Sequence, residues 1–207
     1  MEAFENPLKH WFIMADFWLY FKLGLTHVLD WNAYDHVLYL TALVAAYTFS
    51  SWKRVFWLVS IFTIGHTISL ALAAYGVVRV DIRFVEFLIP VSIIAAAVYN
   101  LFTAKQNIAS QKVNLLYFVT LFFGLIHGFG FSTYFILISE SVDSITLMLI
   151  QFALGIEVAQ LIVVSVVLIL AFIFQNIFNF AKRDWILVIS ALIIGLSIPI
   201  LRENWLW

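Results

Sequence analysis

The sequence predicts an all-α fold, a polytopic bundle of transmembrane helices. Hydrophobic residues make up 64% of the 207 positions and charged residues only 11%, whereas about a quarter of a soluble domain is charged. The apolar residues also fall in runs of about twenty, the helix length that crosses a hydrocarbon core of roughly 30 Å. No internal repeat or hydrophilic linker divides the chain. We therefore expect a single integral membrane domain over residues 1–207, embedded in a lipid bilayer.

The first apolar stretch, residues 8–29, is the least typical of a span. Lys9, Asp16, Lys22 and His27 interrupt it, and this pattern is typical of an amphipathic helix that lies in the membrane interface. We expect an interfacial helix here, with a seventh span as the alternative. About six spans follow, near residues 34–49, 55–76, 83–102, 113–138, 145–175 and 185–201.

The charges between the spans predict the orientation. The loops that follow the first, third and fifth spans hold one acid, Asp184, and the cations Lys53, Arg54, Lys105, Lys112, Lys182 and Arg183. Because loops rich in Lys and Arg stay cytoplasmic, we expect both termini outside, in the periplasm of a bacterium whose inner membrane holds the chain. The net charge of −1 gives no indication of a nucleic-acid partner. The absence of cysteine excludes disulfides and thiolate metal sites.

Ionisable side chains inside the apolar spans indicate function, because a membrane core tolerates them mainly where pairing or function requires them. His66 and His127 lie near the middle of the second and fourth spans, and Glu157 and Gln160 share one face of the fifth. Three more groups lie around the outer end of the first span and one enters the third: His27, Asp35, His36 and Glu86. We expect all of them at the midplane or in the outer half. Histidines and carboxylates gathered there are suited to Ni²⁺, Co²⁺, Zn²⁺ or Fe²⁺.

Each of these side chains also has a purely structural interpretation. A buried histidine can hydrogen-bond a neighbouring helix, and Glu86 can pair with Arg83. Asp35 and His36 are adjacent and cannot share one helix face, so one can bind metal while the other orients it or caps the span. A carboxylate in mid-span needs a partner or a proton, which favours proton exchange or general-base chemistry for Glu157.

Several of these polar motifs follow one another in a recognisable order. They are Gly24-Leu25-Thr26-His27, Tyr34-Asp35-His36, Phe62-Thr63-Ile64-Gly65-His66, Val85-Glu86, Gly124-Leu125-Ile126-His127-Gly128 and Gly155-Ile156-Glu157-Val158-Ala159-Gln160. In this order they resemble the HupE/UreJ family of small membrane proteins, in particular its second subgroup. The resemblance covers roughly residues 20–170.

The resemblance implies nickel or cobalt uptake, linked to the maturation of hydrogenase and urease. It implies that His27, Asp35 and His36 bind metal, with His66, His127 and Glu157 completing the site. The supporting residues are then Gln160, Glu86, Ser69 and Ser132. The ion is a divalent transition metal, with nickel, cobalt and zinc as the candidates.

Three functions remain open at this point. The first is a metal permease, for which the inner half would need a path along groups such as Thr120, Ser92 and Asn100. The second is an intramembrane zinc hydrolase or transferase that acts on a lipid or a membrane-anchored protein, although no HExxH motif is present. The third is a structural subunit that meets a membrane-protein or envelope partner and uses its buried polar groups for packing alone.

Overall fold

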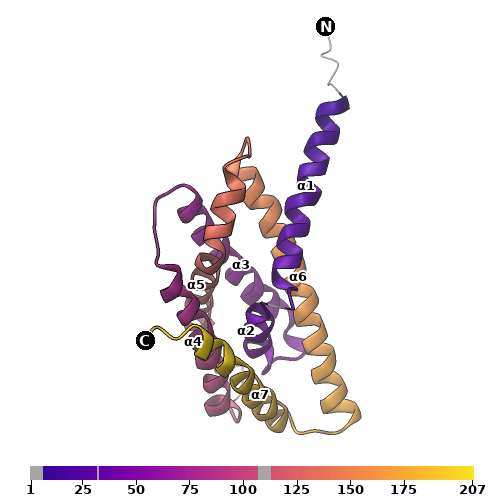
Figure 1. Ribbon diagram of the computed structural model, residues 1–207. Coiled ribbons are helices and arrows are strands. Elements are labelled where there is room, and N and C mark those ends of the chain that lie inside the picture. The colour runs from indigo at the N-terminus through magenta and orange to yellow at the C-terminus, as the bar shows by residue number, and fades with distance from the viewer. Residues whose placement is uncertain (1–6, 32, 107–112) are drawn as a thin grey trace.

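The computed structural model contains helices and no strand in the part of the chain that it describes, residues 7–31, 33–106 and 113–207 (Figure 1). Side chains are described at residues 16–31, 33–106 and 114–207. The predicted all-α fold is confirmed. In chain order the helices are α1 (Pro7–Val28), α2 (Asp35–Val44), a 3₁₀ turn (Phe49–Ser51), α3 (Trp52–Ala74), α4 (Ile82–Thr103), α5 (Val113–Ser139), α6 (Ile145–Phe172), a π-helical turn (Ile173–Ile177) and α7 (Lys182–Glu203).

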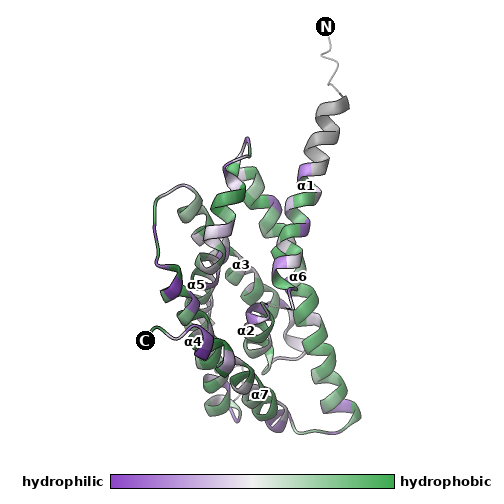
Figure 2. Ribbon diagram, in the orientation of Figure 1, coloured by the Kyte–Doolittle hydropathy of each residue, from purple (hydrophilic) through white to green (hydrophobic). Residues whose placement is uncertain are grey.

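Five of these helices, α3 to α7, are long and apolar enough to cross a membrane. They coincide within a few residues with the predicted spans that begin at 55, 83, 113, 145 and 185. Figure 2 shows hydrophobic residues along most of α6 and α7, and a hydrophilic segment at α2, inside the bundle. The chain is therefore an integral membrane protein. The predicted position of the N-terminus concerns residues 1–6, which lie outside the described residues.

The helices pack in three main pairs, α3 with α5, α1 with α6 and α4 with α7. Helix α2 lies between them and contacts α3, α4, α6 and α7 (Figure 1). Because consecutive spans alternate in direction, α2, α4 and α6 end where α3, α5 and α7 begin. We call this the α3-start end of the bundle, and the opposite one the α3-finish end. Packing of Trp185 and Ala171 against Ala46 and Ala104 agrees with this arrangement.

Helix α2 is shorter than the predicted span over residues 34–49. Its ten residues rise about 15 Å, about half of a hydrocarbon core. At its end, buried side chains from other helices donate hydrogen bonds to backbone carbonyls. Asn100 Nδ2 donates to the Ala42 carbonyl at 2.7 Å, and Trp185 Nε1 donates to the Ala45 carbonyl at 3.1 Å. Broken helices are stable at membrane depth where protein groups satisfy their backbone in this way. Helix α2 is thus a half-length helix enclosed by full-length ones.

Helix α1 packs against α6 through two glycines. A Cβ on Gly24 would overlap the Phe152 carbonyl oxygen, and a Cβ on Gly155 would overlap the Phe21 carbonyl oxygen. Small residues at such crossings let two backbones approach closely. The C-terminal part of α1 is therefore fixed to the bundle, while its N-terminal part projects beyond it (Figure 1). Whether residues 8–29 lie in the interface or span the membrane stays a prediction.

Candidate metal centre

Four histidines from four helices meet in the interior of the bundle. His36 lies at the centre, with its ring centroid 4.7 Å from that of His27, 5.5 Å from that of His66 and 5.3 Å from that of His127. His36, His66 and His127 are 3%, 0% and 1% exposed, and His27 is half-buried. We call these four residues the histidine cluster. The predicted convergence of distant segments is thus present in the structure.

Glycines set the positions of His66 and His127. Gly65 and Gly124 form the crossing of α3 and α5, since a Cβ on either would overlap a backbone oxygen of the other helix. Gly128 lies equally close to the His66 carbonyl. The close crossing places two mid-span histidines at one depth, while the α1–α6 crossing holds His27 and the first turn of α2 supplies His36.

Hydrogen bonds fix the orientation of two of the rings. The Asp35 carboxylate accepts from the backbone N–H of His36 at 2.8 Å and lies 3.0 Å from its Nδ1. Nδ1 of His127 lies 2.8 Å from the Phe123 carbonyl oxygen, to which it donates. A histidine that binds metal through one nitrogen commonly donates its other N–H to a carboxylate or carbonyl. Both rings therefore direct Nε2 into the cluster, and Asp35 lies behind His36 as an orienting group.

Five other imidazole nitrogens of the cluster have no hydrogen-bond partner among the described residues. Nε2 of His27, His36, His66 and His127 and Nδ1 of His66 are all buried and unpartnered. Such groups are rare in folded proteins, because burying a polar atom without a partner is costly. One nitrogen each from His27, His36 and His66 lie within 4.8 Å of one another. A metal about 2.1 Å from each ligand keeps nitrogens roughly 3.4 Å apart, so the set fits a divalent transition metal after a small inward shift.

The other predicted site residues lie apart from these nitrogens. Glu157 accepts hydrogen bonds from Ser60 and Thr63, and Thr63 also contacts Gln160. Ser69 donates to the His66 carbonyl at 2.8 Å. Ser132 donates to the Phe129 carbonyl at 2.6 Å. These two hydroxyls therefore bond within their own helices.

Glu86 is exposed on α4. The sequence allowed Glu86 to pair with Arg83, but Arg83 pairs with a different acid. Arg83 forms a salt bridge with Asp81 at 3.1 Å, which caps the N-terminus of α4. The hydrogen bonds from Arg83 hold the pKa of the Asp81 carboxyl below its usual range.

An aromatic layer lies one helical turn from the histidines. Tyr39 follows His36 by three residues, Phe62 precedes His66 by four, and Phe123 precedes His127 by four. Given the helix directions, all three point to the α3-start side. The Tyr39 ring stacks on Phe62 at 4.8 Å and meets Phe123 edge-on at 5.6 Å. The spacing of three or four from each histidine was the signal in the sequence that could have identified this layer.

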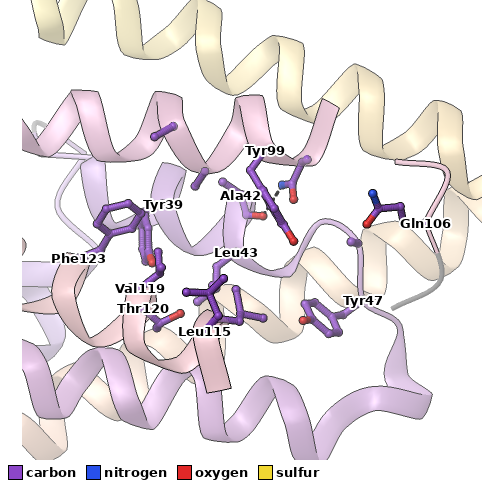
Figure 3. A pocket seen from close by; sticks show the side chains of 15 residues that line it. Tyr39, Ala42, Leu43, Tyr47, Tyr99, Gln106, Leu115, Val119, Thr120 and Phe123 are labelled. Carbon is purple, nitrogen blue, oxygen red and sulfur yellow. Dashed lines mark hydrogen bonds between the residues drawn. The ribbon is translucent and has the colours of Figure 1, made fainter. Parts of the chain in front are cut away.

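Two cavities lie on opposite sides of the cluster. The His27 cavity, about 400 Å³, is bounded by His27, Asp30, Trp31 and Tyr134. The Tyr39 cavity, about 540 Å³, has Tyr39 and Phe123 at one end and Gln106 and Tyr47 at the other (Figure 3). Thr120 and Asn100, two of the groups expected along an inner path, line it. The histidine cluster and the aromatic layer thus separate two cavities.

Comparison with known proteins gives the family. The model of the family described as HupE / UreJ protein matches residues 7–202, nearly the whole chain. The chain belongs to the HupE/UreJ family. No curated protein and no solved structure matches it. The resemblance expected from the ordered motifs is therefore confirmed. In this HupE/UreJ protein the matched region contains every residue of the histidine cluster.

Proposed function

We propose that this HupE/UreJ protein is a permease for a divalent transition metal of the nickel or cobalt type. One observation supports this proposal most: the histidine cluster lies between two cavities, and the aromatic layer closes the passage to one of them. A permease needs a binding site that can be reached from either side in turn. The cluster supplies the site, and Tyr39, Phe62 and Phe123 supply a closed barrier.

The direction of transport in this proposal follows from the charged loops. Lys53, Arg54 and Lys182 lie at the α3-start end, toward which the Tyr39 cavity extends. Loops rich in Lys and Arg are typical of the cytoplasmic side. The metal then reaches His27 from the periplasmic side, binds at the cluster and leaves past Tyr39 toward the cytoplasm.

The ligand chemistry suits such a cargo. Neutral imidazole nitrogen is a good ligand for Ni²⁺, Co²⁺ and Zn²⁺, and a poor one for Mg²⁺ or Ca²⁺. Binding by neutral rings leaves the Asp35 carboxylate behind His36 as the charge that partly offsets the double charge of the ion, and this incomplete compensation favours release. The family supports nickel and cobalt over zinc.

An intramembrane hydrolase fits the same site less well. Its metal would need space for a lipid or peptide beside an open coordination position. Here the ring centroid of Phe131 lies 4.0 Å from that of His27. The ring centroid of Phe152 lies 5.8 Å from that of His27 and 6.5 Å from that of His66. Phe131 and Phe152 stack on one another at 5.4 Å. These rings limit the open space beside the nitrogens to the His27 cavity, whose wall includes Phe131 itself. A subunit that uses the histidines for packing alone would leave their nitrogens unsatisfied at a cost in stability.

Metal uptake by the purified chain in liposomes tests the proposal. A metal-sensitive dye inside the vesicles reports Ni²⁺ and Co²⁺ influx, and equilibrium binding is measured in parallel. We expect influx by the wild-type chain and by Glu140→Gln, an exposed loop variant, and none by His66→Ala/His127→Ala. Binding without influx would contradict the permease and favour an enzyme. Absence of binding would leave the packing role.

A further inference from the structure

A second polar cluster joins α3 to α6 beside the histidines. Ser60 Oγ donates to one oxygen of Glu157 at 2.7 Å, and Thr63 Oγ1 donates to the other. Gln160, one helical turn from Glu157, places its Oε1 3.1 Å from the same Thr63 hydroxyl. We call these four residues the Glu157 cluster. It supplies a carboxylate, two hydroxyls and an amide, all oxygen ligands of the kind that small hard cations prefer.

Among the described residues, no salt bridge to Glu157 is present. The Asp35–His36 contact and the Asp81–Arg83 salt bridge involve other carboxylates. Among the described residues, the helices packed against α6 carry these acidic, basic and histidine side chains: Lys53, Arg54 and His66 on α3, Asp35 and His36 on α2, and Asp16, Lys22 and His27 on α1. Of these, Asp16, Lys22 and Lys53 are exposed. An ionised carboxylate at this depth requires a counter-charge, and two hydroxyl donors supply only part of it.

Gln160 gives an independent indication of a ligand. Its side chain is 0% exposed, and its amide nitrogen has no hydrogen-bond partner. Thr63 has a single hydroxyl hydrogen, which the short contact to Glu157 uses. Turning the amide over lets its nitrogen donate to Thr63 and presents its oxygen unpartnered to the cluster. A buried amide in this position is poorly satisfied until a further group binds.

We propose that the Glu157 cluster is a second cation site, which holds one monovalent cation, a proton or Na⁺, and releases it when the divalent metal binds at the histidine cluster. Both candidates supply the same chemistry, a single positive charge on the Glu157 carboxyl. The inference rests on the proposed metal binding, because it concerns how that binding is coupled to a second ion.

The coupling follows from the position of Thr63. Thr63 and His66 are three residues apart on one buried face of α3 and are therefore neighbours on the helix surface. A divalent ion at His66 and a monovalent ion at Glu157 repel one another through an interior of low dielectric constant. Each ion must then weaken the binding of the other by the same factor, since linkage is reciprocal. Movement of the metal down its gradient can thereby drive movement of the monovalent cation, and movement of the monovalent cation can likewise drive that of the metal.

Cobalt binding to the full-length protein in lipid nanodiscs tests this coupling. The Co²⁺ absorption spectrum gives affinity, and a pH dye in weakly buffered choline chloride counts the protons released for each Co²⁺ bound. We compare the wild type with Glu157→Gln, which keeps the size of the side chain but removes the charge and replaces one acceptor oxygen with an amide donor. Glu140→Gln, in an exposed loop, is the matched control and should behave as the wild type. The titration is then repeated with NaCl in place of choline chloride.

Two results support the second site and identify its ion. If the wild type releases about one proton more per Co²⁺ than Glu157→Gln, the ion is a proton. If the proton counts agree but NaCl weakens Co²⁺ binding roughly fivefold or more in the wild type alone, the ion is Na⁺. Should Glu157→Gln fail to fold, Ser60→Ala keeps the carboxylate and should reduce the same effect by removing one oxygen.

Two other results overturn the inference in different ways. Equal proton release and equal salt response in the wild type and Glu157→Gln would show that the Glu157 cluster serves helix packing only. Absence of a Co²⁺ spectrum in the wild type would eliminate the metal site itself, and the coupling with it.

Discussion

The ring of Tyr39 lies 5.1 Å from the ring of His127 and also forms one end wall of the Tyr39 cavity. This side chain is 1% exposed, so the cavity and the histidine cluster are separated by the thickness of one aromatic ring. Phe62 and Phe123 hold that ring from two sides. Metal that leaves the cluster toward the α3-start end therefore has to displace Tyr39 or pass its edge.

The first prediction concerns this barrier. In Tyr39→Leu the smaller side chain opens the passage, so Ni²⁺ leaves preloaded vesicles faster by about tenfold, the change that a barrier lower by 1.4 kcal/mol produces. Equilibrium binding should change little, because the histidine nitrogens are retained. Stopped-flow dye fluorescence measures the rate. Tyr39→Phe keeps the ring and should match the wild type, and an unchanged rate in Tyr39→Leu would show that the barrier lies elsewhere.

The second prediction concerns the partner of His36. Asp35→Asn retains a side chain of the same size but loses the charge that holds Nδ1–H of His36. Groups behind a metal-binding histidine typically contribute 10- to 100-fold to metal affinity, so we expect Co²⁺ binding to weaken by about that factor. Isothermal titration calorimetry gives the affinity. The exposed Asp143→Asn is the control, and a loss of all binding would indicate that Asp35 is itself a ligand.

Composition and run length were enough to predict the all-α membrane fold and five of its long helices. The depth of each ionisable residue within its span also predicted that the histidines converge. Depth alone does not give the direction in which a side chain points around a helix axis. The separation of Glu157 from the histidine cluster therefore became clear only in the structure, where Ser60 and Thr63 bind it.

The length of α2 was beyond prediction for a different reason. Residues 37–49 are apolar apart from Thr41 and Thr48, and they contain no glycine or proline. At the end of the helix, Asn100 and Trp185 donate to the carbonyls of Ala42 and Ala45, and these donors lie 58 and 140 positions away in the chain. Contacts of this range leave no local pattern. The aromatic layer, in contrast, did have a local pattern, its regular spacing from the histidines.

The third prediction concerns the crossing of α3 and α5. A Cβ on Gly65 would overlap backbone atoms of Leu121, and backbone cannot move aside as a flexible side chain can. Overpacking of this kind costs about 1–3 kcal/mol, so Gly65→Ala should lower the thermal unfolding midpoint and weaken metal binding together, because the crossing positions His66. Gly195→Ala on α7 is the matched control. Nothing lies within 4 Å of the Cβ added there, and it should be neutral or slightly stabilising. Equal stability of the two variants would contradict the close crossing.

The last prediction concerns the end of α2. Asn100→Leu removes the donor to the buried Ala42 carbonyl, which costs about 1–3 kcal/mol for an unsatisfied group. The unpaired Ala42 carbonyl then favours a backbone N–H of the following turn as its partner. We therefore expect α2 to extend toward Thr48 and to narrow the Tyr39 cavity. We expect a lower unfolding midpoint, together with slower Ni²⁺ release at unchanged equilibrium affinity. Asn100→Asp keeps an oxygen but offers no amide donor, so it should share these effects, whereas Asn100→Gln can still donate and should partly restore release. If Asn100→Leu changes stability without affecting release, then the end of α2 is a structural feature only, and the cavity beside it does not limit the passage of metal.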